Sequence, residues 1–414
     1  MKILFLTENF PPESNAAANR VYERACYWAN WGHDVTVITS APNFPQGVLH
    51  QGFRNRWYQT ERMDGIRVVR VKTFIAPNRG TMLRLLDFLS FMITGFCAAL
   101  VQGKPDVIVA TSPQFFTAVA GWLAAAVKRK PFVFELGDIW PASIVAVGAM
   151  EQNLFLRLME KFELFLYRRS ASVAALTAAF KDNLIRRGID GDKISVVMNG
   201  VDLSRYAPRA PDVELAREWN IHGKFVVGYF GTHGMAHGLM NVLDAAELMR
   251  DEPNICFLLV GDGAERADLV RAANDRKLEN VVLISAQPKE FMPRIWSICD
   301  VALVHLRASP VFTEVIPSKT FEAMAMGVPV LLATPPGEAS RILAEDEAGL
   351  HVAPEDPQAL ADAVRKLAED AVLLKQYSDH ALASAPRHTR LRQAQEMLQT
   401  LEIAAAGWGS RAGL

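Results

Sequence analysis

Residues 310–332 read PVFTEVIPSKTFEAMAMGVPVLL and combine a helix signal with a strand signal. Ser318 is a favoured residue for the start of a helix, and apolar residues recur after it at helical spacing. Gly327 predicts the end of that helix, because glycine readily takes the left-handed conformation that closes helices. The apolar run that begins at Pro329 then predicts a buried strand. A helix followed at once by a buried strand is typical of an α/β fold.

Two carboxylates, Glu314 and Glu322, lie before and after the predicted helix start. A helix N-terminus attracts anions, and Lys319 adds a full positive charge there. Phosphate groups would bind beside Ser318 and Lys319, while hydroxyl groups would donate to the two glutamates. The stretch therefore predicts a ligand that carries both groups, such as a nucleotide-sugar. On spacing alone, a solvated helix start with two surface glutamates is an equal alternative.

The length and composition of the chain predict two globular domains. The chain has 414 residues, of which 50% are hydrophobic, so each domain can bury a sizeable core. Four cysteines lie far apart in apolar surroundings and form no Cys-x-x-Cys pair: Cys26, Cys97, Cys256 and Cys299. This pattern predicts reduced, buried thiols in a cytoplasmic protein rather than disulfides or a zinc site. The first strand begins at Met1, so we expect no cleavable signal peptide.

Charge is distributed unevenly along the chain. Residues 1–205 hold 24 Lys and Arg against 17 Asp and Glu, whereas the remaining residues hold 20 against 28. The basic N-terminal half predicts an anionic partner there. A phospholipid surface or a pyrophosphate-linked acceptor is favoured, and nucleic acid is disfavoured. Ordinary scatter of charge is the alternative.

The first part of the chain alternates between strands and helices. Residues 1–7 and 33–39 predict parallel strands on either side of a helix. No Gly-x-Gly-x-x-Gly follows the first strand, so a dinucleotide cofactor bound by that fingerprint is disfavoured. The loop instead carries small residues around Asn15 and Ala17, which let a ligand approach the backbone. Residues 43–60 are rich in Pro, Gly and aromatic residues and predict a long loop.

Residues 85–101 form the most hydrophobic stretch of the chain. Its length is close to that of a bilayer span, but Asp87 and Gly95 lie inside it. Three interpretations are open: a buried core helix, a helix that dips into one face of a membrane, and a true span. The last is disfavoured, because strands of one domain are predicted on both sides of the stretch.

Polar residues follow the predicted strand at residues 132–136. Asp138 comes directly after this strand, where open α/β sheets bind ligands, and could orient or deprotonate an acceptor hydroxyl. A helix-capping role is an equal alternative for Asp138. Glu135 competes with it for the acceptor role, and Trp140 follows in the same loop.

A second α/β unit begins with a strand at residues 224–230. The sequence GTHGMAHG follows at residues 231–238, and a helix is predicted from Leu239 to Arg250. Glycine-rich turns between a strand and a helix cradle phosphates, because backbone N–H groups point inward and the helix end adds partial positive charge.

The sequence at residues 310–332 resembles a motif of a known family. The pattern Glu314-x7-Glu322, followed by Ala-Met-Ala-x-Gly-x-Pro-Val, resembles the donor-site signature of retaining glycosyltransferases of family 4, which have the GT-B fold. The wording Pro-Ser-Lys-Thr-Phe-Glu resembles the branch that builds bacterial surface polysaccharides, such as the colanic-acid and O-antigen transferases, including N-acetylfucosamine transferases. The resemblance covers nearly the whole chain, and its specific motifs lie in residues 228–332 and 135–141.

The resemblance implies an α/β fold of two Rossmann-like, doubly wound parallel-sheet domains that face each other across a cleft. Residues 1–200 would form the acceptor-binding domain, and a helix at about 388–408 would pack back on it. Residues 210–385 would form the donor domain. The resemblance also implies acceptor contacts from the loops that carry Asn15, Ala17, Glu135, Asp138 and Trp140.

Donor-site roles follow from the same resemblance. Glu314 would contact the transferring sugar, Glu322 the ribose, and Lys319 the diphosphate, so that Glu314, Asp138 and Lys319 are the expected catalytic residues. Other donor contacts are expected from Gly231, Thr232, His233, Gly234, His237, Gly261, Gln287, Pro288 and Ser318. The family commonly has Arg and Lys where this chain has Thr232 and His237. We therefore expect diphosphate binding to depend more on Lys319. We also expect it to be sensitive to pH, since histidine titrates near neutrality.

Neither a metal nor a cofactor is expected. No metal-binding Asp-x-Asp lies at a strand end, and Asp190-Gly-Asp192 is predicted to form a turn before a strand. The expected activity is the transfer of a sugar, with retention, from a nucleotide-sugar to a saccharide acceptor. A UDP-sugar is the expected donor, and a lipid-pyrophosphate-linked saccharide is the expected acceptor. The expected location is the cytoplasmic face of the inner membrane.

Two other functions stay open at this stage. A GT-B-shaped sugar-nucleotide 2-epimerase or hydrolase would need no acceptor. A non-catalytic partner that binds nucleotide-sugars is favoured only by the missing Arg and Lys in the Gly-rich loop.

Overall fold

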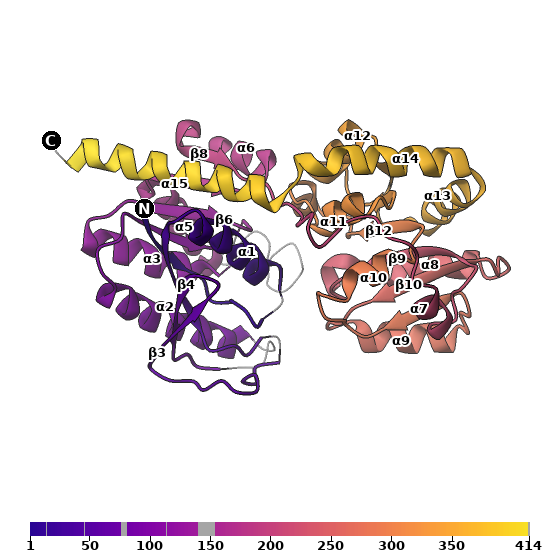
Figure 1. Cartoon of the computed structure of the whole chain (residues 1–414), viewed down its shortest axis with the longest axis horizontal. Helices are drawn as coiled ribbons and strands as arrows, with labels where there is room; N and C mark the ends of the chain where they lie inside the picture. Colours follow the sequence, from indigo (N-terminus) through magenta and orange to yellow (C-terminus); the bar gives the residue numbers. More distant parts are fainter. Residues whose placement is uncertain (14, 45, 76–80, 113, 140–153, 413–414) are drawn as a thin grey trace. The chain divides into compact units, whose positions relative to one another are not determined.

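The computed structural model describes the chain except residues 14, 45, 76–80, 113, 140–153 and 413–414. The chain divides into two compact units, each built around its own sheet (Figure 1). The N-terminal unit comprises Met1–Asn199 together with Arg390–Leu414, and the C-terminal unit comprises Gly200–Thr389. The chain therefore leaves the first unit, forms the second, and returns to the first for its final helix.

The centre of the N-terminal unit is a sheet of eight strands: β1 (Lys2–Leu6), β2 (Asp34–Ser40), β3 (Tyr58–Met63), β4 (Ile66–Val71), β5 (Val107–Thr111), β6 (Phe132–Leu136), β7 (Ser172–Ala175) and β8 (Ile194–Val196). Their order is β3-β4-β2-β1-β5-β6-β7-β8, and all pairs are parallel except β3 with β4. β5 and β6 are buried along their whole length, as expected of parallel strands covered on both faces.

The edge strand β3 is an element that the sequence analysis missed, because residues 43–60 were expected to be a loop. β3 pairs with β4 through a tight turn at Asp64 and Gly65, whose φ angles are 48° and 82°. Asp-Gly is the dipeptide that favours this hairpin turn, since both central residues need positive φ. That signal could have identified the hairpin, although β3 itself alternates only between exposed and half-buried residues.

Helices cover the sheet of the N-terminal unit: α1 (Ala16–Asn30), α2 (Thr81–Val101), α3 (Phe115–Lys128), α5 (Leu154–Arg169), α6 (Ala178–Arg186) and α15 (Arg390–Ala412). The last of these packs against α1. The indole N–H of Trp28 donates to the carbonyl of Ala394 at 2.9 Å, and Arg390 pairs with Glu23 at 2.8 Å. Met397 and Leu401 join the same buried core. The C-terminal helix is thus part of the first unit.

The C-terminal unit has a parallel sheet of six strands: β9 (Phe225–Phe230), β10 (Ile255–Val260), β11 (Val281–Ile284), β12 (Val301–His305), β13 (Val330–Ala333) and β14 (Gly349–Val352). Their order is β11-β10-β9-β12-β13-β14. In chain order this is 3-2-1-4-5-6, which defines a doubly wound sheet. The parallel part of the N-terminal sheet has the same order with one further strand, 3-2-1-4-5-6-7. The predicted fold class, two doubly wound α/β domains, is therefore confirmed.

The helices of the C-terminal unit are α7 (Val213–Glu218), α8 (Met240–Leu248), α9 (Arg266–Asp275), α10 (Met292–Trp296), α11 (Lys319–Met326), α12 (Glu338–Glu345), α13 (Pro357–Glu369) and α14 (Ala371–Ser384). Two short 3₁₀ helices, η2 (Met235–His237) and η3 (Pro310–Thr313), lie in the loops after β9 and β12. The core between α8, α13 and the sheet is aliphatic and aromatic throughout.

The four cysteines are free, but they are not all buried. Cys256 is buried, Cys26 and Cys299 are half-buried, and Cys97 is exposed on α2. The expectation of four buried thiols is therefore wrong for Cys97. Among the described residues, α2 is the one helix long and apolar enough to cross a membrane by length and composition.

Candidate functional site

The candidate site is the edge of the C-terminal sheet at which the parallel strands end. β9 and β12 are neighbours there, and the chain winds away from them in opposite directions. In doubly wound sheets, ligands bind at such a switch point, outside the carboxyl ends of the strands. The loops that meet at this edge follow β9, β10, β11 and β12, and they contain most of the predicted donor residues.

The Gly-rich loop after β9 is fixed by the loop after β10. The N–H of His233 donates to the carbonyl of Asp262 at 2.8 Å, and the Tyr229 hydroxyl donates to the carbonyl of Thr232 at 2.8 Å. A Cβ on Gly261 would lie 1.8 Å from the carbonyl oxygen of Gly231, so only glycine permits this approach. Gly231 also has a φ of 143°, which favours glycine.

The loop differs from the predicted phosphate cradle in two respects. η2 lies inside the loop, between Gly234 and Gly238, so the loop is partly helical before α8 begins at Met240. The N–H groups of Gly231, His233 and His237 donate to backbone carbonyls of the protein itself. These three amides are therefore committed to the fold, and a phosphate would depend more on side chains than the sequence analysis expected.

Lys319 supplies the positive charge at this edge. It begins α11, and its ammonium nitrogen lies 3.6 Å from the centroid of the Tyr229 ring. The same nitrogen lies beside Gly231, at 3.0 Å from where a Cβ would stand. The residue as a whole is half-buried, yet Nζ has no exposed surface and no hydrogen-bond partner in the described protein. Burial lowers the pKa of Lys319 to about 7, and the carboxylate of Glu322 opposes this shift.

Two predicted donor residues, His233 and His237, lie in the same environment. Both ring nitrogens of His233 and Nδ1 of His237 are buried and lack a hydrogen-bond partner among the described residues. Burial and neighbouring cations lower the pKa of His233 to about 4 and that of His237 to about 3. The expectation that these histidines make the site pH-sensitive near neutrality is therefore wrong. Lys319 is the group whose pKa lies near 7.

His305, at the end of β12, is a site residue that the sequence analysis missed. Its ring is fully buried, with Nδ1 at 2.6 Å from the carbonyl oxygen of His237 and Nε2 at 2.9 Å from the amide nitrogen of Asn241. Burial lowers its pKa to about 4, so the ring is neutral at pH 7. Nδ1–H therefore donates to His237, and Nε2 accepts from Asn241. A histidine that ends a buried strand was the available signal.

The stretch at residues 310–332 folds nearly as the sequence predicts. α11 begins at Lys319 and ends at Gly327, which has a φ of 72°. Glu322 lies in the first turn, and Glu314 follows η3 in the preceding loop; both carboxylates belong to half-buried residues. Ser318 occupies the cap position, but its side chain makes no capping hydrogen bond and its backbone is already helical. The predicted serine cap is therefore wrong, and the Ser318 hydroxyl has no role in the helix start.

Gln287 and Pro288 lie in the loop after β11, at the same edge of the sheet. The Gln287 amide donates to the carbonyl of Ser285 at 3.2 Å, and Arg266 donates to the Ser285 hydroxyl at 3.1 Å. This loop is separated from β9 by β10, so it lies farther from Lys319 than the Gly-rich loop does.

In the N-terminal unit, Glu135 is buried rather than available to an acceptor. It pairs with Arg24 at 2.8 Å and with Arg20 at 3.2 Å, and the three side chains are almost fully buried. Burial opposes ionisation of Glu135, but the two guanidinium groups outweigh it and lower its pKa. This arrangement argues against the expected direct acceptor contact and gives Glu135 a role in packing.

The other predicted acceptor residues lie at the carboxyl edge of the N-terminal sheet. Ser112, after β5, accepts from the N–H groups of Gly137 and Asp138 and so fixes the backbone of Asp138, which is half-buried. Asn15 caps α1 by accepting from the N–H of Ala18, and Ala17 is half-buried in the first turn. Trp140 lies outside the described residues.

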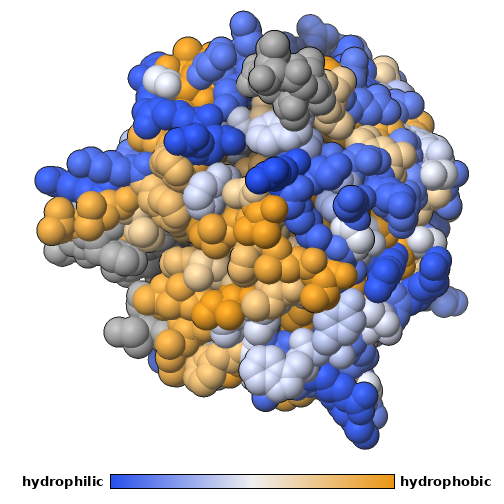
Figure 2. All heavy atoms as spheres, turned by 90° about the vertical axis from the view of Figure 1, so that its left-hand side faces the viewer, coloured by the Kyte–Doolittle hydropathy of each residue, from blue (hydrophilic) through white to orange (hydrophobic). Residues whose placement is uncertain are grey.

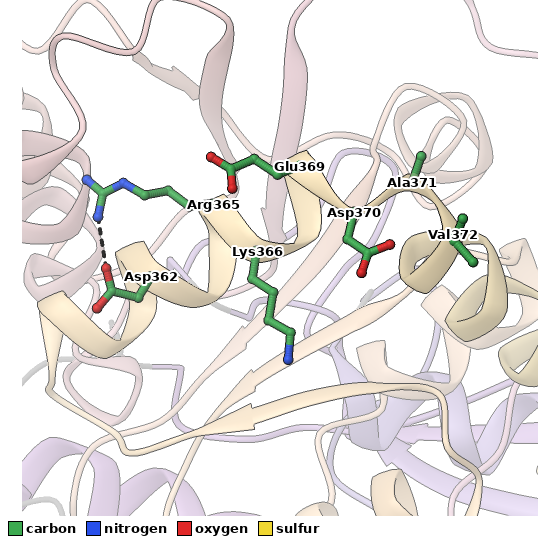
Figure 3. Close-up of a pocket in the computed structure, with 7 residues that line it drawn as sticks. All are labelled: Asp362, Arg365, Lys366, Glu369, Asp370, Ala371 and Val372. Atoms are coloured by element: carbon green, nitrogen blue, oxygen red, sulfur yellow. Dashed lines mark hydrogen bonds and ion pairs between the residues drawn. The ribbon is translucent and has the colours of Figure 1, made fainter.

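A surface depression of about 760 Å³ lies elsewhere, where α13 ends and α14 begins (Figure 3). Its charged side chains are exposed and several are already paired: Arg365 with Asp362 at 2.9 Å and with Glu252 at 2.8 Å. Asp370 accepts from the N–H of Leu373 at the start of α14. No buried unpaired group faces the depression among the described residues, so we do not assign it as the site.

No group of three or more His, Cys, Asp or Glu that could hold a metal is found in the described part of the chain. The Asp190-Gly-Asp192 segment forms a turn, in which the side chain of Asp190 accepts from the N–H of Asp192. This turn precedes β8, as expected from the sequence.

Comparisons with known proteins identify both units. The profile of the glycosyl transferase 4-like domain matches residues 15–200, and that of glycosyl transferases group 1 matches residues 214–383. WcaI of Escherichia coli K12, named as a glycosyl transferase of colanic acid biosynthesis, is 26% identical over 94% of this chain and 96% of its own. The GDP-mannose-dependent alpha-mannosyltransferase of Mycobacterium tuberculosis is 27% identical over 80% of this chain and 78% of its own.

A solved structure with the same fold is that of Anabaena HepE in complex with UDP. It aligns with a TM-score of 0.73 and 21% identity over 97% of this chain and 100% of its own.

Proposed function

Since the chain belongs to the family 4 glycosyltransferases and has their GT-B fold, we propose that it transfers a sugar from a nucleoside diphosphate sugar to a saccharide acceptor. The proposed role is in polysaccharide biosynthesis, the process for which the relative WcaI is named. The proposed donor is a UDP-sugar, because UDP is the nucleotide bound in the HepE structure. GDP is the competing nucleotide, because one relative depends on GDP-mannose. The proposed acceptor is a lipid-linked saccharide at the cytoplasmic face of the inner membrane.

The buried, unpartnered ammonium group of Lys319 is the observation that carries this proposal. An amine without a hydrogen-bond partner is costly to bury, and a bound ligand that supplies acceptor atoms would remove that cost. A diphosphate supplies both the negative charge and the acceptor oxygens that this nitrogen lacks. The switch point beside β9 is also the place where doubly wound sheets bind nucleotides.

The other residues have roles that fit their positions. Lys319 and Ser318 hold the diphosphate, so that Lys319 stabilises the negative charge of the leaving nucleotide. Glu322, in the first turn of the same helix, accepts from the ribose hydroxyls, and Glu314 contacts the transferring sugar. Asp138 orients the acceptor hydroxyl. We propose retention by attack on the same face from which the nucleotide leaves, as the resemblance to retaining family 4 transferases implies.

We propose that the reaction needs no divalent metal. Asp190 and Asp192 serve a turn, and the positive charge for the leaving diphosphate comes from Lys319. This part of the proposal is tested by adding EDTA to the binding and turnover assays.

The test is a thermal-shift panel of the purified chain with UDP, GDP, ADP and CMP, each with magnesium or EDTA. A nucleotide that binds the native state raises the unfolding midpoint by mass action. We expect a shift with UDP that survives EDTA and is lost in Lys319→Met. Lys366→Met, at an exposed lysine near the α13–α14 depression, is the matched control and keeps the shift.

Turnover then separates the proposal from the alternatives. Release of UDP that depends on a lipid-linked acceptor supports the transferase. Consumption of the nucleotide-sugar without any acceptor would instead indicate an epimerase or hydrolase. Tight binding with no turnover under any condition would indicate a non-catalytic partner.

A further inference from the structure

α2 exposes much more apolar surface than a core helix does. Residues Leu83–Val101 have a mean hydropathy of 1.7, yet only 22% of this stretch is buried. One face of α2 packs on α3, β2 and β4. The other face exposes Leu86, Ile93, Cys97 and Val101, which follow one another at helical spacing.

Residues from neighbouring segments extend this stripe. The N–H of Phe74 donates to the Ser90 hydroxyl on α2 at 2.7 Å, and the Phe74 side chain is exposed. At the C-terminal end of α2, the Lys128 ammonium donates to the carbonyl oxygens of Leu100 and Gln102 at 3.0 and 2.8 Å, which brings the exposed Val127 alongside. We call the set Phe74, Leu86, Ile93, Cys97, Val101 and Val127 the α2 surface.

Exposed aromatic and basic residues border the α2 surface at the same end. Gln102 donates to the Tyr58 hydroxyl at 3.1 Å, and Trp57, the residue before Tyr58, is 71% exposed. The ammonium of Lys72 lies 4.9 Å from the centroid of the Trp57 ring. Lys104 and Arg129 are exposed immediately beyond the ends of α2 and α3.

Figure 2 shows apolar residues gathered in a continuous area at the end of the molecule that lies on the left in Figure 1, with hydrophilic residues around it. This is the end of the N-terminal unit where α2 and α3 lie. An apolar surface of this kind on a soluble protein marks a place of interaction.

We propose that the α2 surface binds the interfacial region of an anionic lipid bilayer, with Ile93 and Val101 entering the acyl boundary and Lys72, Lys104 and Arg129 facing lipid phosphates. Apolar side chains with cations and an aromatic residue at their edge are the features that hold a helix in a membrane interface. This inference rests on the proposed function, since a lipid-linked acceptor would present its pyrophosphate at such a surface.

The fold excludes a membrane-spanning α2, and charge argues against a second copy of the chain as the occupant. β4 and β5, which precede and follow α2 in the chain, both lie in the N-terminal sheet, so α2 cannot leave the unit to span a bilayer. A second copy of the chain is a poorer occupant, because a two-fold interface brings the same basic border of both copies together. An anionic surface instead complements that border.

The experiment is co-sedimentation of the full chain with vesicles of phosphatidylethanolamine and phosphatidylglycerol, compared with vesicles of phosphatidylcholine alone. We expect binding to the anionic vesicles that weakens with salt. The double variant Ile93→Gln with Val101→Gln loses binding by about tenfold or more, because two apolar side chains no longer enter the membrane. The control Leu248→Gln with Val372→Gln changes two exposed apolar residues of the C-terminal unit and binds like the wild type.

A second variant tests the charged border separately. Lys104→Gln with Arg129→Gln lowers binding to anionic vesicles by about tenfold at low salt and weakens the salt dependence of the residual binding, since Lys72 is the one cation of the border that remains. Analytical ultracentrifugation of the same proteins tests the second-copy alternative. A wild type that dimerises and ignores vesicles, with a monomeric Ile93→Gln, Val101→Gln variant, would overturn the proposal in favour of that interface.

The outcomes separate this inference from the proposed function. The UDP thermal shift is measured on the same variants, none of which lies at the candidate site. Vesicle binding lost with the UDP shift intact supports the inference. Wild-type vesicle binding that the glutamine variants retain in full overturns it, whatever the nucleotide result is. Absence of the UDP shift in the wild type overturns only the proposed function.

Discussion

Both parallel sheets contain the strand order 3-2-1-4-5-6, but the buried charged groups at their carboxyl edges differ in whether a counter-ion lies beside them. In the N-terminal unit, Glu135 is matched by Arg20 and Arg24 within 3.2 Å. In the C-terminal unit, the ammonium of Lys319 is buried against Tyr229 with no acceptor in the described protein. The strand order defines where a ligand can bind in each unit. Polar atoms without hydrogen-bond partners occur at both edges, among them Oε2 of Glu135, but Glu135 has two guanidinium groups as counter-ions within 3.2 Å, whereas the Lys319 ammonium has no hydrogen-bond acceptor among the described residues.

Removing the Glu135 carboxylate from the N-terminal edge should give the largest change in stability. Glu135→Ala leaves two guanidinium groups buried without their carboxylate, and breaking a buried pair costs about 3–5 kcal/mol. We expect the free energy of unfolding of the N-terminal unit to fall by this amount, measured by urea denaturation followed by tryptophan fluorescence. Glu396→Ala, at an exposed pair on α15, is the control and changes stability by less than about 1 kcal/mol. Equal stability of the Glu135→Ala and Glu396→Ala variants would show that the buried ion pair at the N-terminal edge does not stabilise the unit.

Removing the Lys319 ammonium from the C-terminal edge should not lower the stability of the unligated protein. Lys319→Met deletes a buried amine that no protein group satisfies, so stability stays level or rises. UDP affinity falls by about 100-fold, because charge-assisted hydrogen bonds to the diphosphate are lost. Isothermal titration with UDP and urea denaturation on one preparation test both statements. A variant that is destabilised and still binds UDP normally would mean that Lys319 serves packing.

The hydrogen bonds of His305 test whether UDP binding at the C-terminal edge depends on a fixed Gly-rich loop. His305→Leu removes the donor to the His237 carbonyl and the acceptor for Asn241, leaving both without their partners. We expect about 1–3 kcal/mol lower stability and about tenfold weaker UDP binding, because the loop is no longer fixed. His305→Gln, which can donate and accept, should recover part of the affinity. Loss of stability with unchanged UDP affinity would show that the loop does not depend on this contact.

The smallest expected effect is a pH dependence of UDP binding at the C-terminal edge. The pKa of Lys319 is lowered to about 7 by burial, so the fraction of charged amine in the free protein falls as the pH rises through 7. A bound diphosphate favours the charged form, and UDP affinity should therefore decrease between pH 6 and pH 9. Proton uptake on binding, measured by titration in buffers of different ionisation enthalpy, should be largest near pH 8 and absent in Lys319→Met.

The same pKa shift has a second consequence, for the stability of the unligated protein. A lysine in the unfolded chain keeps its proton up to its usual pKa of about 10.4. Between pH 7 and that value the unfolded state binds more protons, so stability should rise with pH and fall as the pH drops through this range. The slope should be weaker in Lys319→Met, measured by denaturation at a series of pH values. A slope unchanged by the variant would assign it to other groups.

The sequence predicted the fold well, because doubly wound sheets rest on apolar strands and glycine-rich turns that can be recognised locally. β3 was missed because it is a polar edge strand, whose only signal is the Asp64-Gly65 turn. For α2, the sequence left a core helix and an interfacial helix open. The structure shows one packed face and one exposed face.

The chemistry of the site was less predictable. The pairing of Glu135 with Arg20 joins residues 115 positions apart, and no local pattern signals it. The neutral state of His233 and His237 depends on burial, which only the folded chain defines. Lys319, in contrast, was recognised from the sequence, since its motif is local to one helix start. Its missing partner became visible only with Tyr229 and Gly231 in place.

The return of α15 to the first unit bears on how the chain is made. On the ribosome, the residues that complete the N-terminal core, including Ala394, Met397 and Leu401, are synthesised after the whole C-terminal unit. Until they emerge, the apolar side of α1 around Trp28 lacks the residues that cover it. The second unit has all of its strands by then and is free to fold first. α15 therefore completes a unit whose other elements are all translated before the C-terminal unit.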